Sequence, residues 1–391
     1  MYRYMDVKLL ADKLKNEMVF WRREIHAYPE IGLEENRTGD FVAKELEILG
    51  IEVTRVAGTG VLGILKGRGN GKTVALRADM DALPIAETSE VPFKSKNSGV
   101  MHACGLDGHI AMLLGAAKIL SQLRNTFNGT IKFIFQPAEE IGLGAIEFIE
   151  AGVMKDVDAI LGLHLWPDLP SGKVSLVPGP RMAAADKIRI TVKGKTGHGS
   201  MPHQGIDAIL AAAAITMNLQ SIVSREIPPL EAAVITIGKF VGGTSWNITS
   251  DEVYLEGTTR CFSHEIRKNL LQAIERVAKD TAASYQAQAE VEFIRISLPV
   301  INDLQTTTIA ANSLQKLYGE NMQGNSEKVM GGEDFSFFLE TIPGAMAFIG
   351  VGNKEKQTDY PLHNDKFNID EDVLPIGAAL HAQFALDFLN S

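Results

Sequence analysis

Acidic and imidazole side chains follow three predicted strands of this chain, each at the point where the strand ends. They are Asp79 and Asp81 after the strand 73–77, Glu139 and Glu140 after the strand 131–135, and His164 after the strand 159–163. In an open α/β sheet, ligands bind at the edge formed by the carboxyl ends of the strands. Buried charges are costly unless they are paired or bound to a metal ion, so core packing alone does not explain three such strand ends. We therefore expect a metal or catalytic site at this edge.

A potential metal ligand also precedes the first helix of the stretch 101–140. Asp107 is a favourable helix N-cap, and apolar residues follow it at helical spacing, so a helix is predicted to begin there. Cys104 precedes this cap and is expected on a loop above the helix N-terminus. His109 falls inside the helix and is interpreted as a structural histidine.

The pair Glu139 and Glu140 closes the same stretch. Pro137 ends the hydrogen-bond ladder of the strand before it, so both glutamates are expected just beyond the carboxyl end of that strand. A solvated acidic pair without a function is the alternative interpretation.

The composition describes an ordinary folded protein without a basic face. The chain has 391 residues, of which 45% are hydrophobic and 22% charged, which suits two domains with ample cores. Its net charge of −10 argues against nucleic acid or an anionic membrane as a partner. We expect no signal peptide and no membrane span, because no apolar run has the required length. Two cysteines do not form a disulfide framework, which favours the cytoplasm.

Hydrophobic periodicity predicts two different sheets. Helices among the strands of the first sheet are predicted at 7–27, 38–49 and 145–151 and from Ile309 onward. Between 185 and 297 the predicted order is β-α-β-β-α-β, with a long helix at 207–223, and this order is ferredoxin-like. We therefore predict an α/β fold with a catalytic domain formed by 1–184 and 298–391 and an inserted domain at 185–297.

Six motifs in the same order resemble the M20 family of metallopeptidases and amidohydrolases, in particular its N-acyl-amino-acid amidohydrolase branch. They are RREIHAYPEIGLEE at 22–35, LRADMDALP at 76–84, MHACGLDGH at 101–109, FQPAEE at 135–140, GHGSMPH at 197–203 and HNDKF at 363–367. The resemblance covers nearly the whole chain. It implies a zinc-peptidase-like α/β domain that holds two divalent metal ions, and an inserted ferredoxin-like domain that mediates dimerisation.

The resemblance also implies the metal ligands, which are Cys104, Glu140, His164 and His363. Cys104 would bridge both ions, Glu140 and His363 would complete one site, and His164 would belong to the other. The fifth ligand of the family is a histidine at the position where this chain has Leu106. Leucine has no lone pair to donate, so the second site would keep two protein ligands, where catalytic sites usually keep three. We expect that site to be weak or empty, either through an inactivating change or in a natural one-metal variant.

Two further carboxylates receive roles from the same resemblance. Glu139 would be the general base, which takes a proton from the attacking water and returns it to the leaving amine. Asp81, together with Asp79, would orient a ligand side chain. Capping of the following turn is the alternative role for these two aspartates.

Three residues of the inserted domain are implied as substrate contacts. His198 would reach across a dimer and stabilise the oxyanion. Asn247 and Arg260 would hold the carboxylate of the substrate, for which a guanidinium is well suited. The family usually has Asn-x-Ile-Pro-Asp after this asparagine, whereas the chain reads NITSD and lacks the proline.

These residues predict a metal-dependent hydrolase that cleaves the amide bond of N-acyl-L-amino acids, as a homodimer or higher oligomer. A carboxypeptidase acting on short peptides is one alternative. A catalytically silent dimeric binding protein is another alternative, which Leu106 supports because it stands where a metal-binding histidine is expected. A thiolate with imidazoles suits zinc, while manganese, cobalt and nickel are also compatible with the donor set. The acyl group and the amino acid do not follow from the residues.

Overall fold

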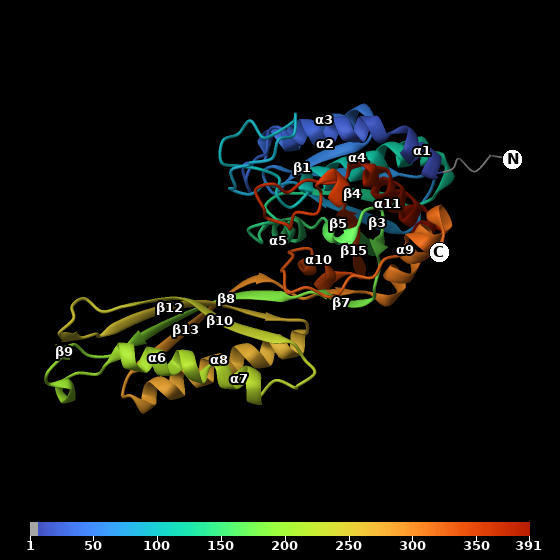
Figure 1. Cartoon of the computed structure of the whole chain (residues 1–391). Coiled ribbons are helices and arrows are strands. Elements are labelled where there is room, and N and C mark those ends of the chain that lie inside the picture. Colours follow the sequence, from blue (N-terminus) through green and yellow to red (C-terminus); the bar gives the residue numbers. More distant parts are fainter. Residues whose placement is uncertain (1–6) are drawn as a thin grey trace. The chain divides into compact units, whose positions relative to one another are not determined.

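The computed structural model describes residues 7–391 and divides them into two compact units (Figure 1). The first unit comprises the chain up to Arg181, Ile301–Glu327 and Asp334–Ser391, and the second comprises Met182–Val300 and Lys328–Glu333. The sequence predicted the inserted domain at 185–297 alone. Lys328–Glu333 groups with the second unit because the backbone N–H of Ala183 donates to the carbonyl of Val329 at 3.1 Å.

The first unit is built on a seven-stranded sheet in the order β1-β2-β4-β3-β5-β15-β6. Its strands are β1 Glu52–Val56, β2 Gly60–Lys66, β3 Thr73–Asp79, β4 Thr130–Gln136, β5 Ala159–Pro170, β6 Val174–Ser175 and β15 Gly344–Gly352. The central pairs β4–β3, β3–β5 and β5–β15 are parallel. All residues of β3 are buried, as expected for a parallel strand that is covered on both faces.

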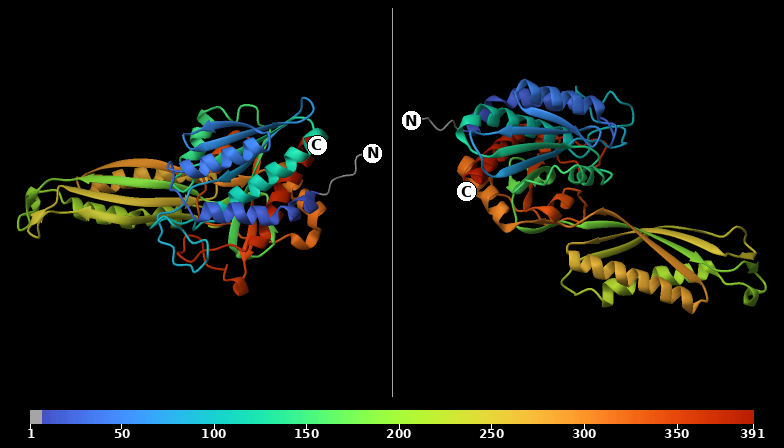
Figure 2. Two further views of the ribbon diagram at one scale, coloured as in Figure 1. Left: turned by 90° about the horizontal axis from the view of Figure 1, so that it is seen from above. Right: turned by 180° about the vertical axis from the view of Figure 1, so that it is seen from behind.

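Helices lie on both sides of this sheet (Figures 1 and 2). They are α1 Val7–Lys13, α2 Lys15–His26, α3 Asn36–Ile48, α4 Leu106–Gln122, α5 Gly144–Glu150, α9 Leu304–Tyr318, α10 Ser336–Thr341 and α11 Leu374–Leu389. Short 3-10 helices are η1 Arg124–Thr126, η3 Glu320–Met322, η4 Lys354–Lys356 and η5 Glu371–Val373. Helix α4 is buried along almost its whole length and contacts both α11 and β3, so it is a core helix.

The start of α4 differs from the prediction. The helix begins at Leu106, and its N-cap is Gly105, whose backbone is left-handed (φ 89°). Asp107, predicted as the N-cap, instead lies in the first helical turn, where its buried carboxylate accepts a hydrogen bond from Arg22 Nε at 2.6 Å. The capping rule fails here because a distant residue engages the carboxylate.

Other helix boundaries also differ. The predicted helices 7–27 and 207–223 are each interrupted at one residue, Leu14 and Leu219 respectively. Helix α9 begins earlier than predicted, because the side chain of Asp303 caps it. These shifts do not change the order of elements.

The second unit contains a four-stranded antiparallel sheet in the order β10-β12-β8-β13, with helices on one face (Figure 2). Its elements are β8 Ala184–Lys193, β9 Gly197–His198, η2 Pro202–Gln204, α6 Ala208–Asn218, α7 Gln220–Arg225, β10 Ala233–Gly242, β11 Ile248–Thr249, β12 Glu252–Cys261, α8 His264–Ser284 and β13 Gln288–Ser297. A separate pair is formed by β7 Gly179–Met182 and β14 Val300–Asn302, most of whose residues belong to the first unit. The α/β fold class with a β-α-β-β-α-β insertion is therefore confirmed.

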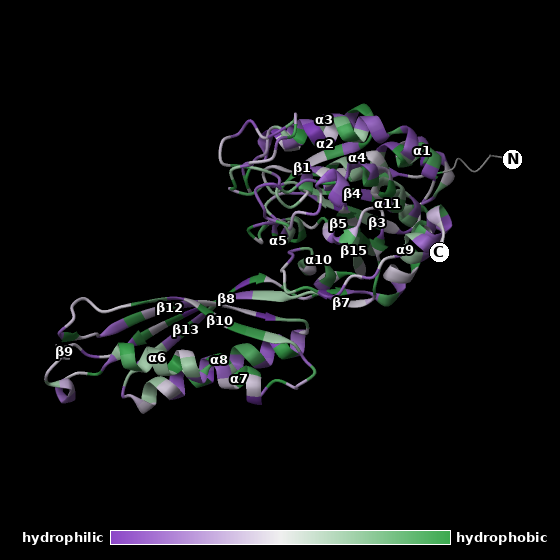
Figure 3. Cartoon of the chain, in the orientation of Figure 1, coloured by the Kyte–Doolittle hydropathy of each residue, from purple (hydrophilic) through white to green (hydrophobic). Residues whose placement is uncertain are grey.

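One stretch of the described residues, Ala208–Arg225, is long and apolar enough to cross a membrane by length and composition alone. It comprises α6 and α7 and is interrupted at Leu219. Ala211, Ala212 and Ile215 on this stretch are buried in the core of the second unit, so packing against the sheet accounts for its hydropathy. Hydrophobic and hydrophilic residues alternate along the neighbouring helix α8 (Figure 3), which also buries one face.

Replacing Phe133 with alanine should lower the free energy of unfolding by about 3–5 kcal/mol, because its ring is fully buried on β4 and its removal leaves a cavity. Phe20→Ala is the matched control. Phe20 is 60% exposed, so its loss should change the free energy by less than about 0.5 kcal/mol. Urea unfolding measures both values, and equal effects would contradict the central position of β4.

Candidate metal centre

The parallel strands bring the predicted acidic and imidazole groups to one edge of the sheet. In the register of β3 and β4, Asp79 lies opposite Gln136, so both strands end at the same level. Asp81 and Glu139 follow these two ends, and β5 carries His164 past the level where its pairing with β3 ends. The sheet therefore positions these groups at one edge. Asp79 and His164 do not follow their strands as predicted but lie inside β3 and β5, because both strands are longer than the predicted 73–77 and 159–163.

Three of the four predicted metal ligands form one compact set. Cys104, Glu140 and His363 each offer one ligand atom, and these atoms all lie within 4.8 Å of one another. His363 Nε2 is 3.5 Å from Glu140 Oε2. The fourth residue, His164, places its Nε2 3.7 Å from the sulfur of Cys104. All four predicted ligands therefore lie together.

The protonation of His164 suits metal binding. Its Nδ1 donates a hydrogen bond to the carbonyl of Leu165 at 2.8 Å, so the lone pair of the neutral ring is on Nε2, which faces Cys104. Burial lowers the pKa of His164 to about 3, which keeps the ring neutral. Sulfur, nitrogen and oxygen donors at this spacing fit a divalent transition metal such as zinc.

Backbone conformation sets two of these ligands. Cys104 precedes Gly105, whose left-handed φ of 89° suits glycine and turns the chain into α4. His363 is itself left-handed (φ 62°), and its N–H donates to the carbonyl of Ala103 at 2.8 Å. Left-handed conformations of residues other than glycine cost free energy and cluster at functional sites. The two loops that carry these ligands are thus tied to each other.

Leu106 is the first residue of α4 and is buried. Its position next to Gly105 places it beside the loop of Cys104. Its aliphatic side chain has no donor atom, so this position supplies no ligand. The expected weakness of the second metal site stays a prediction.

Asp81 holds the backbone of the acidic loop, which we define as residues 138–140 after β4. Its Oδ1 accepts from the N–H of Glu139 at 2.9 Å, and its Oδ2 accepts from the N–H of Glu140 at 3.0 Å. The sequence predicted that Asp81 orients a ligand side chain or caps the next turn, whereas these bonds go to backbone amides from a different strand end. Burial, with a contribution from nearby Glu35, raises the pKa of Asp81 to about 7.

A buried network below the acidic loop was not predicted. Arg77 donates to Asp79 at 2.9 Å, to Gln136 at 2.9 Å and to Asp334 at 3.1 Å. Asp334 in turn donates from its backbone N–H to Oε1 of Glu139 at 3.3 Å. The charged and amide residues inside β3 and β4 were the available signal, because such residues seldom lie in buried strands without partners.

His109 has the structural role that the sequence suggested. Its Nδ1 lies 2.6 Å from Asp79, and its Nε2 accepts from the N–H of Leu165 at 2.9 Å. Both ring nitrogens are therefore engaged. The role of Asp79 is to orient this histidine, which packs edge-on against the ring of His164.

A second unpredicted network anchors α4. The carboxylate of Asp107 accepts from Arg22 at 2.6 Å and lies 2.8 Å from His26 Nδ1. Although burial opposes ionisation, Arg22 and His26 hold the pKa of Asp107 well below its usual range. This ion pair secures the helix whose N-terminus follows Cys104.

The predicted substrate contacts lie in the second unit. Strands β9 and β11 pair His198 with Ile248, and the N–H of Gly199 donates to the carbonyl of Asn247 at 2.8 Å, so His198 and Asn247 are close. The N–H of Ser200 donates to Nδ1 of His198 at 3.1 Å, which leaves the ring proton on Nε2 as a hydrogen-bond donor.

Arg260 lies on β12 and is half-buried. Burial lowers the pKa of its guanidinium, and its Nη1 donates to the carbonyl of Thr259 at 3.4 Å. The buried carboxylate of Asp186 acts on the guanidinium electrostatically and partly opposes this lowering of the pKa. The substrate role of all three residues stays a prediction.

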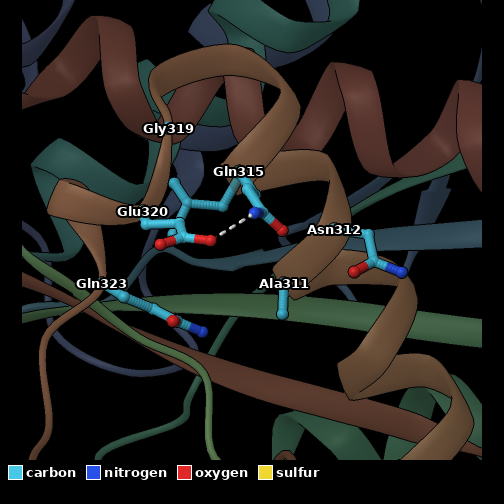
Figure 4. Close-up of a pocket in the computed structure, with 7 residues that line it drawn as sticks. Ala311, Asn312, Gln315, Gly319, Glu320 and Gln323 are labelled. Carbon is cyan, nitrogen blue, oxygen red and sulfur yellow. Dashed lines mark hydrogen bonds between the residues drawn. The ribbon is translucent and has the colours of Figure 1, made fainter.

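A cavity of about 170 Å³ lies at the C-terminal end of α9 (Figure 4). Gln315 Nε2 donates to Glu320 Oε1 at 3.1 Å across it. The lining contains none of the predicted site residues, and its single carboxylate is engaged by the amide. The predicted metal ligands lie at the sheet edge and not at this cavity.

A thiol, a carboxylate and two imidazoles, with a further carboxylate next to them, are the groups of a metal-dependent hydrolase. Residues 75–387 match peptidase family M20/M25/M40, so the chain belongs to this family and the predicted resemblance is confirmed. The chain is 43% identical to thermostable carboxypeptidase 2 of Saccharolobus solfataricus, over 97% of this chain and 99% of that protein.

Two further relatives agree with this membership. N-acetylcysteine deacetylase of Bacillus subtilis is 40% identical, over 98% of this chain and all of that protein. The crystal structure of a dinuclear metal-binding peptidase of the M20 family from Bacillus subtilis matches with a TM-score of 0.85 and 37% identity, over 97% of this chain and 99% of that one. The chain is a metal-dependent hydrolase of the peptidase and amidohydrolase type.

Asp107→Asn should lower the free energy of unfolding at pH 7, because Arg22 and His26 lose a buried anionic partner. The pKa of Asp107 is depressed in the folded protein, so its contribution is complete above the unfolded pKa of about 4 and is lost as the pH falls below that value. Urea unfolding from pH 6 to pH 3 should show that the difference in free energy of unfolding between wild type and variant becomes smaller. A difference that does not depend on pH would contradict the ion pair.

Proposed function

We propose that this chain hydrolyses the amide bond of N-acyl-L-amino acids that carry a free α-carboxylate. The observation that carries the proposal is the convergence of Cys104, Glu140, His363 and His164 beside Glu139. The names of the relatives support it, since they include a deacetylase of an N-acyl amino acid. The carboxypeptidase relative supports hydrolysis of short peptides as the alternative within the same class.

Different residues of the chain would carry out the separate steps of such a hydrolysis. A divalent cation held by Cys104, Glu140 and His363 would polarise the substrate carbonyl and lower the pKa of water to about 7. Glu139 takes the proton of the attacking water and delivers it to the leaving amine nitrogen. Asp81 accepts from the backbone N–H groups of Glu139 and Glu140 and so holds both residues, of which Glu140 belongs to the ligand set and Glu139 is the proposed base.

The second unit would supply substrate contacts. The Nε2–H of His198 is a donor suited to the oxyanion of the tetrahedral intermediate, and its tautomer is set by Ser200. Asn247 and Arg260 would bind the α-carboxylate. In the family resemblance this histidine acts across a dimer, so we propose a homodimer or a higher homo-oligomer as the active form.

We further propose that the chain holds one metal ion tightly and a second weakly, because Leu106 replaces the imidazole that would accompany His164. A catalytically silent binding protein is the second candidate function, and Leu106 is the observation that favours it. Zinc is the first metal to test, followed by manganese, cobalt and nickel.

The experiment measures metal content per chain together with hydrolysis of N-acetyl, N-benzoyl and longer N-acyl amino acids and of dipeptides. Turnover of the N-acyl substrates that disappears on chelation and returns with metal supports the proposal. A preference for dipeptides would show that the chain is a carboxypeptidase. Binding of N-acyl amino acids without turnover would show that it is a silent binding protein.

Glu139→Gln should lower kcat by about 10²–10⁴-fold, because the amide cannot accept the proton of the attacking water. Metal content should be unchanged, since the proposed ligand is the neighbouring Glu140. Glu150→Gln, on the exposed end of α5, is the matched control and should retain wild-type kcat. Loss of metal together with activity in the Glu139 variant would show that this residue is a ligand and not the base.

Leu106→His should add a second metal equivalent per chain and raise kcat by about tenfold or more, because the imidazole gives the second site a third ligand. Leu106→Phe is the control, since it adds a ring of similar shape without a lone pair. Two tightly held ions in the unaltered chain would contradict the prediction. A second ion without a gain in kcat would favour the silent binding protein.

A further inference from the structure

Three successive backbone N–H groups of the acidic loop each donate to a buried carboxylate. The N–H of Ala138 donates to Oε1 of Glu35 at 2.8 Å, and those of Glu139 and Glu140 donate to the two oxygens of Asp81. Consecutive N–H groups that converge in this way form an anion-binding concavity. In this chain, two protein carboxylates occupy it.

Glu35 reaches this loop from a distant part of the chain and is completely buried. Its Oε2 accepts from the hydroxyl of Thr59 at 2.7 Å. No lysine or arginine within residues 7–391 forms an ion pair with it, and burial raises the pKa of Glu35. Burying a carboxylate without a cationic partner is costly, so the bonds that it makes must offset that cost.

The ordinary role of an acidic residue before a helix does not account for Glu35. It occupies the N-cap position of α3, yet its side chain makes no capping hydrogen bond to that helix. N-cap side chains normally accept from the first helical N–H groups. Here the carboxylate is directed to Thr59 and Ala138 instead.

Ala138 is the residue that needs such a partner. It is left-handed (φ 54°), a conformation that costs an alanine free energy. The turn that leads to Glu35 packs directly on it, since a side-chain carbon added at Gly32 would lie 3.2 Å from the Cα of Ala138. The hydrogen bond from Ala138 to Glu35 therefore holds the turn from which Glu139 and Glu140 project.

We propose that Glu35 is a positioning residue of the metal centre. By accepting the N–H of Ala138, it keeps that residue left-handed, so that Glu140 reaches the ligand set and Glu139 is held for proton transfer. The inference rests on the proposed function for the role of Glu139, but its effect on metal binding through Glu140 is separate from turnover.

The test compares Glu35→Ala and Glu35→Gln with Glu34→Ala and Glu34→Gln, because Glu34 is the adjacent but exposed glutamate. Zinc affinity is measured by competition with a chromophoric chelator, alongside kcat, KM and thermal unfolding. Glu35→Ala should weaken zinc binding by about 10–100-fold, the usual cost of losing a residue that orients a ligand. It should lower kcat while changing KM by less than about threefold.

Glu35→Gln keeps a carbonyl oxygen that can accept from Ala138, so it should recover most of the zinc affinity and kcat. It also keeps the proposal testable if the alanine variant does not fold. Both Glu34 variants should match the wild type within about twofold. Thr59→Val removes the hydroxyl bond to Glu35 and leaves the bond from Ala138 in place, so it should lower thermal stability without changing zinc affinity.

A Glu35→Ala protein that unfolds at lower temperature but binds zinc with wild-type affinity would overturn the proposal, since Glu35 would then be only structural. Zinc affinity that falls equally in Glu35→Ala and Glu35→Gln would also overturn it. If the wild type binds zinc but hydrolyses no N-acyl amino acid, the proposed function fails while the zinc measurements still decide the role of Glu35.

Discussion

Parallel pairing of β3, β4 and β5 is the constraint on which the metal centre depends. Parallel strands in register must end at the same edge, so the residues after β3 and β4 meet although more than fifty positions separate them in the sequence. Cys104 and His363 arrive on loops from outside the sheet. The bond from the N–H of His363 to the carbonyl of Ala103 joins these loops to each other. The sheet thus fixes the acidic half of the proposed centre, and one backbone contact aligns the half that would bind through sulfur and imidazole.

The periodicity of hydrophobic residues along the sequence was sufficient to predict most of the fold and the approximate position of the candidate site. Apolar runs and their breaks identified the parallel strands, and the polar residues toward their carboxyl ends proved to be neighbours, as the topology rule requires, although Asp79 and His164 lie inside longer strands than predicted. Asp107 shows where local reasoning ends. Its position before an apolar repeat predicts an N-cap. Instead, Arg22, which is 85 residues away in the sequence, donates a hydrogen bond to its carboxylate. A buried ion pair of this kind leaves no periodic signal.

The geometry of the acidic loop could not be predicted for a related reason. Ala138 and His363 are left-handed although neither is glycine, and nothing in their residue types indicates it. Both are held by tertiary contacts, Ala138 by Glu35 and His363 by Ala103. Sequence rules describe what the backbone prefers, whereas these two positions adopt what the surrounding structure imposes. Strained positions of this kind concentrate where function needs a fixed side-chain direction.

The electrostatics of the centre explain why a cation is favoured even with an incomplete ligand set. Burial, and then the charges of Glu140 and Glu139, raise the pKa of the Cys104 thiol well above its usual range. Burial likewise raises the pKa of Asp81, which lies within reach of Glu35. A divalent cation reverses these effects, because it stabilises each nearby anion. A neutral imidazole at position 106 would add a donor but no charge. Under the proposed ligand set, Leu106 would leave the attraction for a first cation intact and would remove only the geometry that holds a second.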